Sequence, residues 1–268
     1  MPRFCANISM LFTERAFPER FDAAARAGFA AVEIQFPYGW SREELADRAR
    51  AARVEVVQIN LPAGDPQRGD RGIACDPSRA GEFRDGVGRA LEYARALGCR
   101  QMNCLAGIAP RGLPEAALRE TFVANARWAA AELAREGMTL LVEPINTRTV
   151  PGFWLNRPSQ ALALIDEARA PNLALQFDVF HVHVMEGDVI PEFEAAYGRI
   201  GHVQVADDPG RHEPGTGAID FPALFERIER LGYRGWIGAE YVPSAPTEDT
   251  LGWARRWVHE VPVRRNPW

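Results

Sequence analysis

Four side chains with hard oxygen donors lie at or near the ends of successive apolar runs. Glu143, Asp178, Gln204 and Glu240 each interrupt a segment rich in Leu, Val, Ile, Phe or Ala, at separations of 35, 26 and 36 residues. These separations correspond to about one strand–helix unit each. If the runs are parallel strands, the four side chains converge at the edge where active sites of β/α barrels lie.

Such a cluster requires a positive charge, because neighbouring carboxylates repel and raise one another's pKa. A divalent cation is the simplest compensation, and the all-oxygen donor set favours Mg²⁺ or Mn²⁺ over Zn²⁺. Taken singly, each side chain is explained equally well as a helix cap or as a partner of an arginine. Four in successive runs are explained better by a metal site.

A second metal reading rests on His181 and His183, which would share one face of an extended strand. Barrel hydrolases use such pairs for zinc, but they place the pair at the start of the barrel and add a lysine. We therefore expect His181, three positions beyond Asp178, to lie at the site. His183 is expected to be solvated or to face a helix.

Further polar candidates lie in two connections. Asn60 begins a segment of roughly 18 residues without clear periodicity, a length typical of a lid, and Arg68 and Arg71 follow in it. Arg211 precedes the Gly-rich turn EPGTGAID and has the geometry to bind a substrate carboxylate in a bidentate manner. Each arginine is also compatible with a solvated surface position.

The elements that would position these residues alternate between short β-branched runs and longer Ala- and Arg-rich amphipathic segments. The predicted strands are Arg3–Ser9, Ala30–Phe36, Val54–Asn60, Gln101–Gly107, Thr139–Ile145, Leu173–Phe180, Ile200–Asp207 and Gly235–Val242. The predicted helices include Pro18–Gly28, Arg42–Arg53, Arg79–Gly98, Pro114–Gly137, Pro158–Ala168 and Phe221–Gly232. Gly98, Gly137 and Gly232 are expected to end helices.

Eight strands alternating with about eight helices predict an α/β fold, a (β/α)8 TIM barrel formed by residues 1–268 as one domain. A doubly wound open sheet is the competing layout. It usually carries a glycine fingerprint for a nucleotide, and Gly86-Val87-Gly88 lacks the third glycine. No nucleotide cofactor is therefore expected.

Composition excludes several classes of protein. The chain has 268 residues, a net charge of -5 and 31 basic residues, all of them arginine. The absence of lysine excludes Schiff-base aldolases, lysine-anchored pyridoxal enzymes and a functional GxxxxGK[ST] loop. The acidic balance opposes binding to nucleic acid or to an anionic membrane.

The same reading predicts a cytoplasmic enzyme. No run reaches the roughly 18 apolar residues of a membrane span, and the N-terminus lacks the pattern of a signal peptide. The four cysteines form no CxxC pair and are expected to be reduced and mostly buried.

Together, the order of strand-end donors, the DxxH of Asp178 and His181 and the PGTGAID turn resemble the xylose-isomerase-like barrel superfamily. More narrowly, the chain resembles the hydroxypyruvate isomerase family, which is close to the 2-oxo-tetronate isomerases. The resemblance runs nearly end to end and includes FCANISMLF, NLPAGD, RGIAC, EFRDGV, YARALG, NCLAG, EPIN, HVQVAD and EPGTG.

This resemblance implies isomerisation of hydroxypyruvate to tartronate semialdehyde without nicotinamide or flavin. It implies that Glu143, Asp178, Gln204 and Glu240 hold the metal, that Glu143 and Glu240 are the acid/base pair, and that His181 contacts the substrate. Relatives often have His where this chain has Gln204. Proton transfer through an enediolate fits the residues independently.

Alternatives remain open. A longer sugar acid such as 2-oxo-tetronate is the first, and pocket length set by Phe36, Trp40 and Trp154 would discriminate it. An apurinic endonuclease of the same fold would need many His ligands, and only five His occur. A non-catalytic barrel would have lost a glutamate. Trp253 and Trp257 would line an interface in a homo-oligomer, although helix packing explains them equally well.

Overall fold

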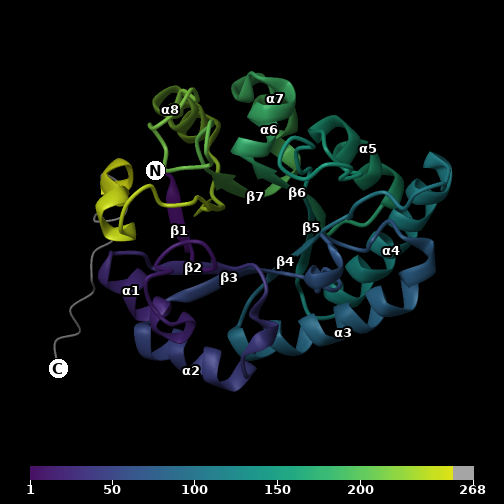
Figure 1. Cartoon of the computed structure of the whole chain (residues 1–268), viewed down its shortest axis with the longest axis horizontal. Coiled ribbons are helices and arrows are strands. Elements are labelled where there is room, and N and C mark those ends of the chain that lie inside the picture. The colour runs from purple at the N-terminus through teal and green to yellow at the C-terminus, as the bar shows by residue number, and fades with distance from the viewer. Residues whose placement is uncertain (256–268) are drawn as a thin grey trace.

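The computed structural model describes residues 1–255, and in it eight parallel strands close into a barrel in chain order, with β1 paired to β8 (Figure 1). This confirms the predicted (β/α)8 fold and excludes the open doubly wound sheet. The strands are β1 Arg3–Asn7, β2 Ala31–Ile34, β3 Glu55–Asn60, β4 Gln101–Cys104, β5 Thr139–Val142, β6 Leu173–Asp178, β7 Ile200–Val205 and β8 Trp236–Ala239.

Helices surround the barrel (Figure 1). The α-helices are α1 Arg20–Arg26, α2 Arg42–Ala52, α3 Ala80–Leu97, α4 Glu115–Ala134, α5 Pro158–Ala168, α6 Val179–Glu186, α7 Val189–Ala196 and α8 Phe221–Leu231. The 3-10 helices are η1 Phe17–Glu19, η2 Pro37–Gly39, η3 Pro66–Arg68, η4 Pro77–Arg79, η5 Tyr197–Arg199 and η6 Thr247–Ala254. None of the helices among residues 1–255 is long and apolar enough to cross a membrane.

The strands divide their side chains between two environments, because successive residues point to opposite faces. Outward-facing residues such as Phe4, Val32 and Phe177 join the main apolar core beneath the helices. Inside the barrel, Cys5, Ala31 and Val57 form a small apolar cluster. Polar side chains on the same strands bond one another across the barrel, and this polar interior underlies the site.

Two of the three predicted helix stops are confirmed. Gly98 and Gly232 follow α3 and α8 with φ values of 67° and 76°, a left-handed conformation that glycine adopts without steric cost. Gly137 lies three residues beyond the last residue of α4, whose C-cap is Arg135.

The segment after β6 differs from the prediction. Val179–Glu186 forms α6 and does not continue the strand, because the Asp178 carboxylate accepts hydrogen bonds from the Phe180 and His181 backbone N–H groups and caps the helix. The extended His-x-His zinc reading is therefore wrong, since residues i and i+2 of a helix point in nearly opposite directions.

All four cysteines are free and buried, as predicted. Trp253 packs edge-on against Phe4 and stacks on Phe225, with ring centroids 5.1 and 6.0 Å apart. Packing within the chain thus accounts for Trp253. Trp257 lies outside the described residues.

Candidate active site

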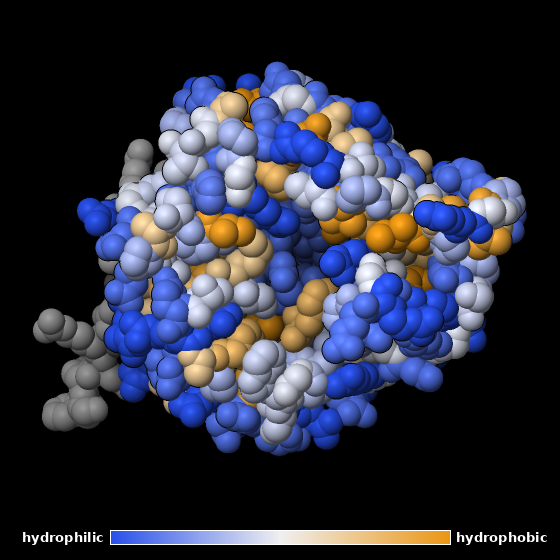
Figure 2. Space-filling view, viewed as in Figure 1, coloured by the Kyte–Doolittle hydropathy of each residue, from blue (hydrophilic) through white to orange (hydrophobic). Residues whose placement is uncertain are grey.

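A cavity of about 580 Å³ opens at the carboxyl ends of the strands. Its lining includes Asn60, Arg71, Glu143, His181, Arg211 and Glu240. Figure 2 shows the hollow at the centre of this face, with hydrophilic residues in its depth. Six residues predicted from distant parts of the sequence thus meet in one cavity.

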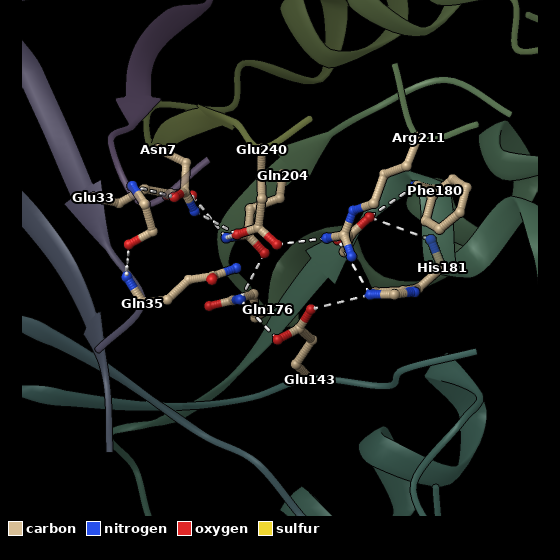
Figure 3. A network of polar contacts seen from close by, with 12 residues as sticks. Asn7, Glu33, Gln35, Glu143, Gln176, Phe180, His181, Gln204, Arg211 and Glu240 are labelled. Carbon is tan, nitrogen blue, oxygen red and sulfur yellow. Dashed lines mark hydrogen bonds and ion pairs between the residues drawn. The ribbon is translucent and has the colours of Figure 1, made fainter. Parts of the chain in front are cut away.

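Glu240 lies one residue beyond β8 and is almost fully buried. Its Oε2 accepts hydrogen bonds from the side-chain amides of Asn7, at 2.6 Å, and of Gln204. Its Oε1 accepts from Arg211 at 2.5 Å. One oxygen is therefore held from inside the barrel, and the other faces the cavity side (Figure 3).

Glu143 lies one residue beyond β5 and is held in a matching way. Its Oε2 accepts from Asn103 at 2.6 Å and from Gln176 at 3.1 Å. Its Oε1 lies 3.8 Å from His181 Nε2. Both glutamates thus have one oxygen occupied by side-chain amides of neighbouring strands.

Arg211 brings a cation between two carboxylates. Its guanidinium lies 3.0 Å from Asp178 Oδ2 and 2.5 Å from Glu240 Oε1, and it covers the ring of Phe180 at 5.3 Å. Despite burial, these carboxylates raise the pKa of Arg211, which is therefore a permanent charge. The residue has φ 57°, a conformation that costs energy for a residue other than glycine.

The loop that carries Arg211 is fixed by Asp207. Its fully buried carboxylate accepts four backbone N–H groups, from Asp208, Gly215, Gly217 and Ile219. A Cβ at Gly217 would lie 2.2 Å from the Asp208 carbonyl oxygen, so only glycine fits there. The close approach of the loop backbone to Asp207 and Asp208 explains why the turn noted in the sequence is rich in glycine.

His181 projects from α6 toward Glu143 and Asp178. The Asn146 backbone N–H donates to its Nδ1 at 3.4 Å, which leaves the proton of the neutral ring on Nε2. Nε2 lies 3.6 Å from Asp178 Oδ2. Burial lowers the pKa of His181 to about 4, and Arg211 lowers it further against the opposing effect of Asp178. His181 is therefore a neutral donor.

The pKa values of the two glutamates shift upward, opposite to that of His181. Burial raises the pKa of Glu143 to about 8, and the charge of Asp178 adds to this against Arg211 and Asn103. Burial also raises the pKa of Glu240 well above its ordinary value, although Arg211 opposes the shift. Perturbed carboxyl groups in a cavity are typical of catalytic sites.

The donor set fits a divalent cation. Glu143, Asp178 and His181 offer ligand atoms within 4.8 Å of one another. Glu240 is joined to Asp178 through Arg211, and Gln204 lies against Glu240. Three buried carboxylates share the single guanidinium of Arg211, which leaves negative charge for a dication to neutralise. The oxygens are ligands that suit Mg²⁺ and Mn²⁺.

The remaining predicted residues fall into two groups, those at or beneath the cavity and those outside it. Asp178 and Gln204 lie among the buried groups beneath the cavity lining, whereas Asn60 and Arg71 line the cavity. Arg68 is not among the lining residues. His183 lies 4.0 Å from Asp208, outside this cavity. The connection after β3 forms one wall of the cavity.

Of the three aromatic residues expected to set pocket length, only Phe36 lines the cavity. Trp40 stacks on Phe17 with ring centroids 4.1 Å apart. Trp154 is buried, and its indole N–H donates to Glu115. Both tryptophans are used in packing, so the prediction for them is wrong.

Sequence reasoning missed the amides and the hydrogen-bonded pair of Glu33 and His202 beneath the glutamates. The missed residues are Asn7, Glu33, Asn103, Gln176 and His202. The available signal was a polar residue inside a short apolar strand, as in Ala-Val-Glu-Ile of β2. Such a residue in a strand that is buried on both faces must find partners inside the barrel.

Comparison with known proteins identifies the family of this chain. Residues 21–260 match the sequence model of a family described as xylose isomerase-like TIM barrel. The chain is 47% identical to hydroxypyruvate isomerase of Escherichia coli K12, over 94% of this chain and 98% of that protein. It is 44% identical to 2-oxo-tetronate isomerase of Cupriavidus necator, over 96% and 99%.

One solved structure is similar to this chain in both fold and sequence. A crystal structure described as AP endonuclease, family 2, from Brucella melitensis superposes with a TM-score of 0.94 at 44% identity. The match covers 96% of this chain and 99% of that one.

Proposed function

The chain belongs to the xylose isomerase-like TIM barrel family and is an isomerase, and we propose that it interconverts hydroxypyruvate and tartronate semialdehyde by proton transfer. The observation that carries this proposal is the matched pair Glu143 and Glu240. Each has one oxygen held by amides and the other on the cavity side. The similarity to the Escherichia coli enzyme supports the choice of substrate.

Glu143, Asp178, Gln204 and Glu240 are the residues that would hold a divalent metal, Mg²⁺ or Mn²⁺, and Gln204 would do so once its carbonyl oxygen turned away from Gln176. When bound, such an ion would polarise the carbonyl and hydroxyl oxygens of the substrate and so acidify the C–H of the hydroxyl-bearing carbon. The reaction leaves the oxidation level of the whole molecule unchanged, so it requires no nicotinamide or flavin.

The protein groups move one proton between adjacent carbons. One glutamate accepts the proton from the hydroxymethyl carbon, which gives an enediolate, and a proton is then returned to the neighbouring carbon. The hydroxyl proton passes from the oxygen of the first carbon to the oxygen of the second, which leaves an aldehyde and a new hydroxyl group. Each glutamate keeps one oxygen on the cavity side, from which it can accept a proton from one carbon and return it to the other. His181, neutral and with Nε2–H directed at this region, donates a hydrogen bond to a substrate oxygen.

The substrate carboxylate needs a cation, and the lining offers Arg211 in the depth and Arg71 at the wall. Asn60 lines the same cavity and adds a polar contact. This arrangement suits a small hydroxy-keto acid. The acidic and amide donor set, with few histidines, supports an isomerase rather than a nuclease built on several zinc ions.

Cavity size supports 2-oxo-tetronate as a second candidate substrate. Hydroxypyruvate has seven non-hydrogen atoms, which at about 30 Å³ each would fill roughly 200 Å³. The cavity of about 580 Å³ leaves room for another hydroxymethyl group. The Cupriavidus necator relative is named for that longer acid.

The test is turnover of both acids by metal-stripped protein before and after Mg²⁺ or Mn²⁺ is added back. We expect activity to return with the metal, and the ratio of kcat/KM values to identify the preferred acid. Glu240→Gln should lose at least about 100-fold in kcat, as is typical when a positioned acid/base group is removed. Metal binding without turnover of either acid would refute the substrate assignment.

A further inference from the structure

A fully buried hydrogen-bonded pair, Glu33 and His202, lies beneath Glu240, inside the barrel. Glu33, at 0% exposure, accepts from His202 Nε2 at 2.5 Å, from Asn7 Nδ2 at 2.9 Å and from Gln204 Nε2 at 2.7 Å. These residues come from β1, β2 and β7, so the cluster joins three strands inside the barrel (Figure 3). Glu33, His202 and Asn7 belong neither to the cavity lining nor to the proposed metal ligands, whereas Gln204 is one of those ligands.

The chemistry of Glu33 fixes the rotation of two amides. An ionised carboxylate only accepts hydrogen bonds, so Asn7 and Gln204 must both turn their NH₂ groups toward it. Each NH₂ group has a second hydrogen, and both direct it at the same oxygen of Glu240, Oε2. The Gln204 carbonyl oxygen is thereby turned toward Gln176, which donates to it at 2.7 Å.

The barrel is built to hold Glu33 in this place. A Cβ at position 238 would lie 2.4 Å from Glu33 Oε2, so the glycine of β8 makes room for the carboxylate. Burial opposes ionisation of Glu33, but His202 and the two amides overcome it and hold its pKa below the ordinary value.

Cys5, Glu33 and His202 also lie within 4.8 Å of one another, but hydrogen bonding accounts for the group. Burial and the charge of Glu33 raise the pKa of Cys5 well above its usual range. Its Sγ lies 3.6 Å from Glu33 Oε2 as a thiol donor. A metal ligand would have to be a thiolate.

We propose that Glu33, held by His202, is a positioning residue for Glu240. It orients Asn7 and Gln204 so that they pin Glu240 Oε2 and leave Oε1 for the substrate side. The inference rests on the proposed function, in which Glu240 transfers the proton. It assigns to a carboxylate that does not line the cavity a role in setting the geometry of one that does.

Glu33→Gln tests the proposal with little change of volume. Asn7 and Gln204 both donate to Glu33 Oε1 and His202 donates to Oε2, so the new NH₂ group must face a donor at either position. The substitution therefore either turns an amide away from Glu240 Oε2 or breaks the His202 bond that holds side chain 33, and in both cases the two amides are less firmly oriented. We expect kcat for hydroxypyruvate to fall 10- to 100-fold with KM within about twofold, and Mn²⁺ to bind about tenfold more weakly in a titration without substrate.

Gln101→Met is the matched control, because Gln101 lies on β4, is partly buried, and its side-chain amide donates to the Gly201 carbonyl oxygen, away from Glu240. It should change neither kcat nor Mn²⁺ affinity by more than about twofold. If Glu33→Gln does not fold, Asn7→Ala replaces it. Asn7→Ala removes one of the two donors to Oε2 and should lower kcat about tenfold.

A folded Glu33→Gln protein with kcat within twofold of the parent overturns the proposal. So does a loss of kcat that Gln101→Met reproduces, since it would reflect destabilisation alone. Failure of the proposed function is seen separately, in the unsubstituted protein: if it turns over neither acid, the Mn²⁺ titration decides. Equal Mn²⁺ affinities of Glu33→Gln and Gln101→Met then contradict the positioning role.

Discussion

In each of the two glutamates at the cavity, one carboxylate oxygen is bound by amides and the other lies on the cavity side. Amide donors from inside the barrel occupy Oε2 of Glu143 and of Glu240, and Oε1 faces His181 in one case and Arg211 in the other. Because the amides are neutral, they orient the carboxylates without neutralising them. The proton affinity of both groups is set by burial and by nearby charge, and in Glu143 the hydrogen bond from Asn103 lowers it.

This arrangement predicts a pH-dependent stability of the metal-free protein. Folded Glu143 keeps its proton to a pKa of about 8, against 4.5 in the unfolded chain, so the native state binds more protons and loses stability as pH rises toward 8. His181 acts oppositely, gaining stability as pH rises toward 6.5. The window from 6.5 to 8 therefore isolates the glutamate effect.

The measurement is the free energy of unfolding between pH 6.5 and 8 with a chelator present. Glu143→Gln should flatten its fall with pH by up to about 1.4 kcal/mol per pH unit, the value for one proton. Glu248→Gln, which alters an exposed carboxyl, should leave the slope unchanged. Parallel slopes for the parent and Glu143→Gln would show that Glu143 does not hold its proton in the fold.

At the residue scale, the sequence identified the groups that end a strand and missed those inside one. Glu143 and Glu240 stood out because each interrupts an apolar run. Glu33 and His202 occupy equally apolar strands but point across the barrel, and no local pattern shows which residue lies opposite. Their pairing depends on barrel closure, which brings β2 and β7 face to face.

At the element scale, the loop from Asp208 to Ile219 is the part that delivers Arg211. Asp207 holds it through four backbone N–H groups, and the Val242 N–H donates to the Arg211 carbonyl oxygen at 2.8 Å. The guanidinium thus reaches Asp178 and Glu240 from a fixed backbone rather than from a mobile one.

Asp207→Ala should release that loop. Loss of the buried acceptor leaves several backbone N–H groups to be resatisfied, which costs about 1–3 kcal/mol of stability. We expect KM for hydroxypyruvate to rise about tenfold, because Arg211 no longer meets the substrate carboxylate in a fixed place.

Asp208→Ala provides the control for this loop, since the Asp208 carboxylate pairs with the exposed Arg148. Steady-state kinetics and thermal unfolding of both variants decide the question. An unchanged KM in Asp207→Ala would mean that the loop does not position the substrate.

Element boundaries were predicted where capping chemistry was local and missed where it was not. Pro158–Ala168 agrees with α5 residue for residue, because proline at its first position marks the start. Val179–Glu186 was assigned partly to a strand because Val-Phe-His-Val is β-prone, yet the Asp178 cap and tertiary packing make it a helix.

At the scale of the whole molecule, barrel closure assembles the site. Four donors from β5 to β8 and the amides from β1, β4 and β6 meet only because β1 pairs with β8. The strand–helix rhythm was sufficient to predict this closure, since a parallel sheet of eight βα units has few other solutions. The width of the cavity was not predictable, because it depends on which aromatic residues are used in packing.

The central claim is that the enzyme moves a proton, through an enediolate, between adjacent carbons of a small hydroxy-keto acid. The most direct measurement is an NMR spectrum of the product formed from hydroxypyruvate in D₂O with added Mn²⁺. The Mn²⁺ is removed by a chelator before the spectrum is recorded, and the deuterium exchange that occurs without enzyme is subtracted. The account predicts deuterium on the carbon that gains hydrogen. In Glu240→Gln, both product formation and deuterium incorporation should be lost. Product formed at full rate with no deuterium at that carbon, in Glu240→Gln as well as in the parent protein, would contradict the account, because the hydrogen would then move without the carboxylate that is proposed to carry it.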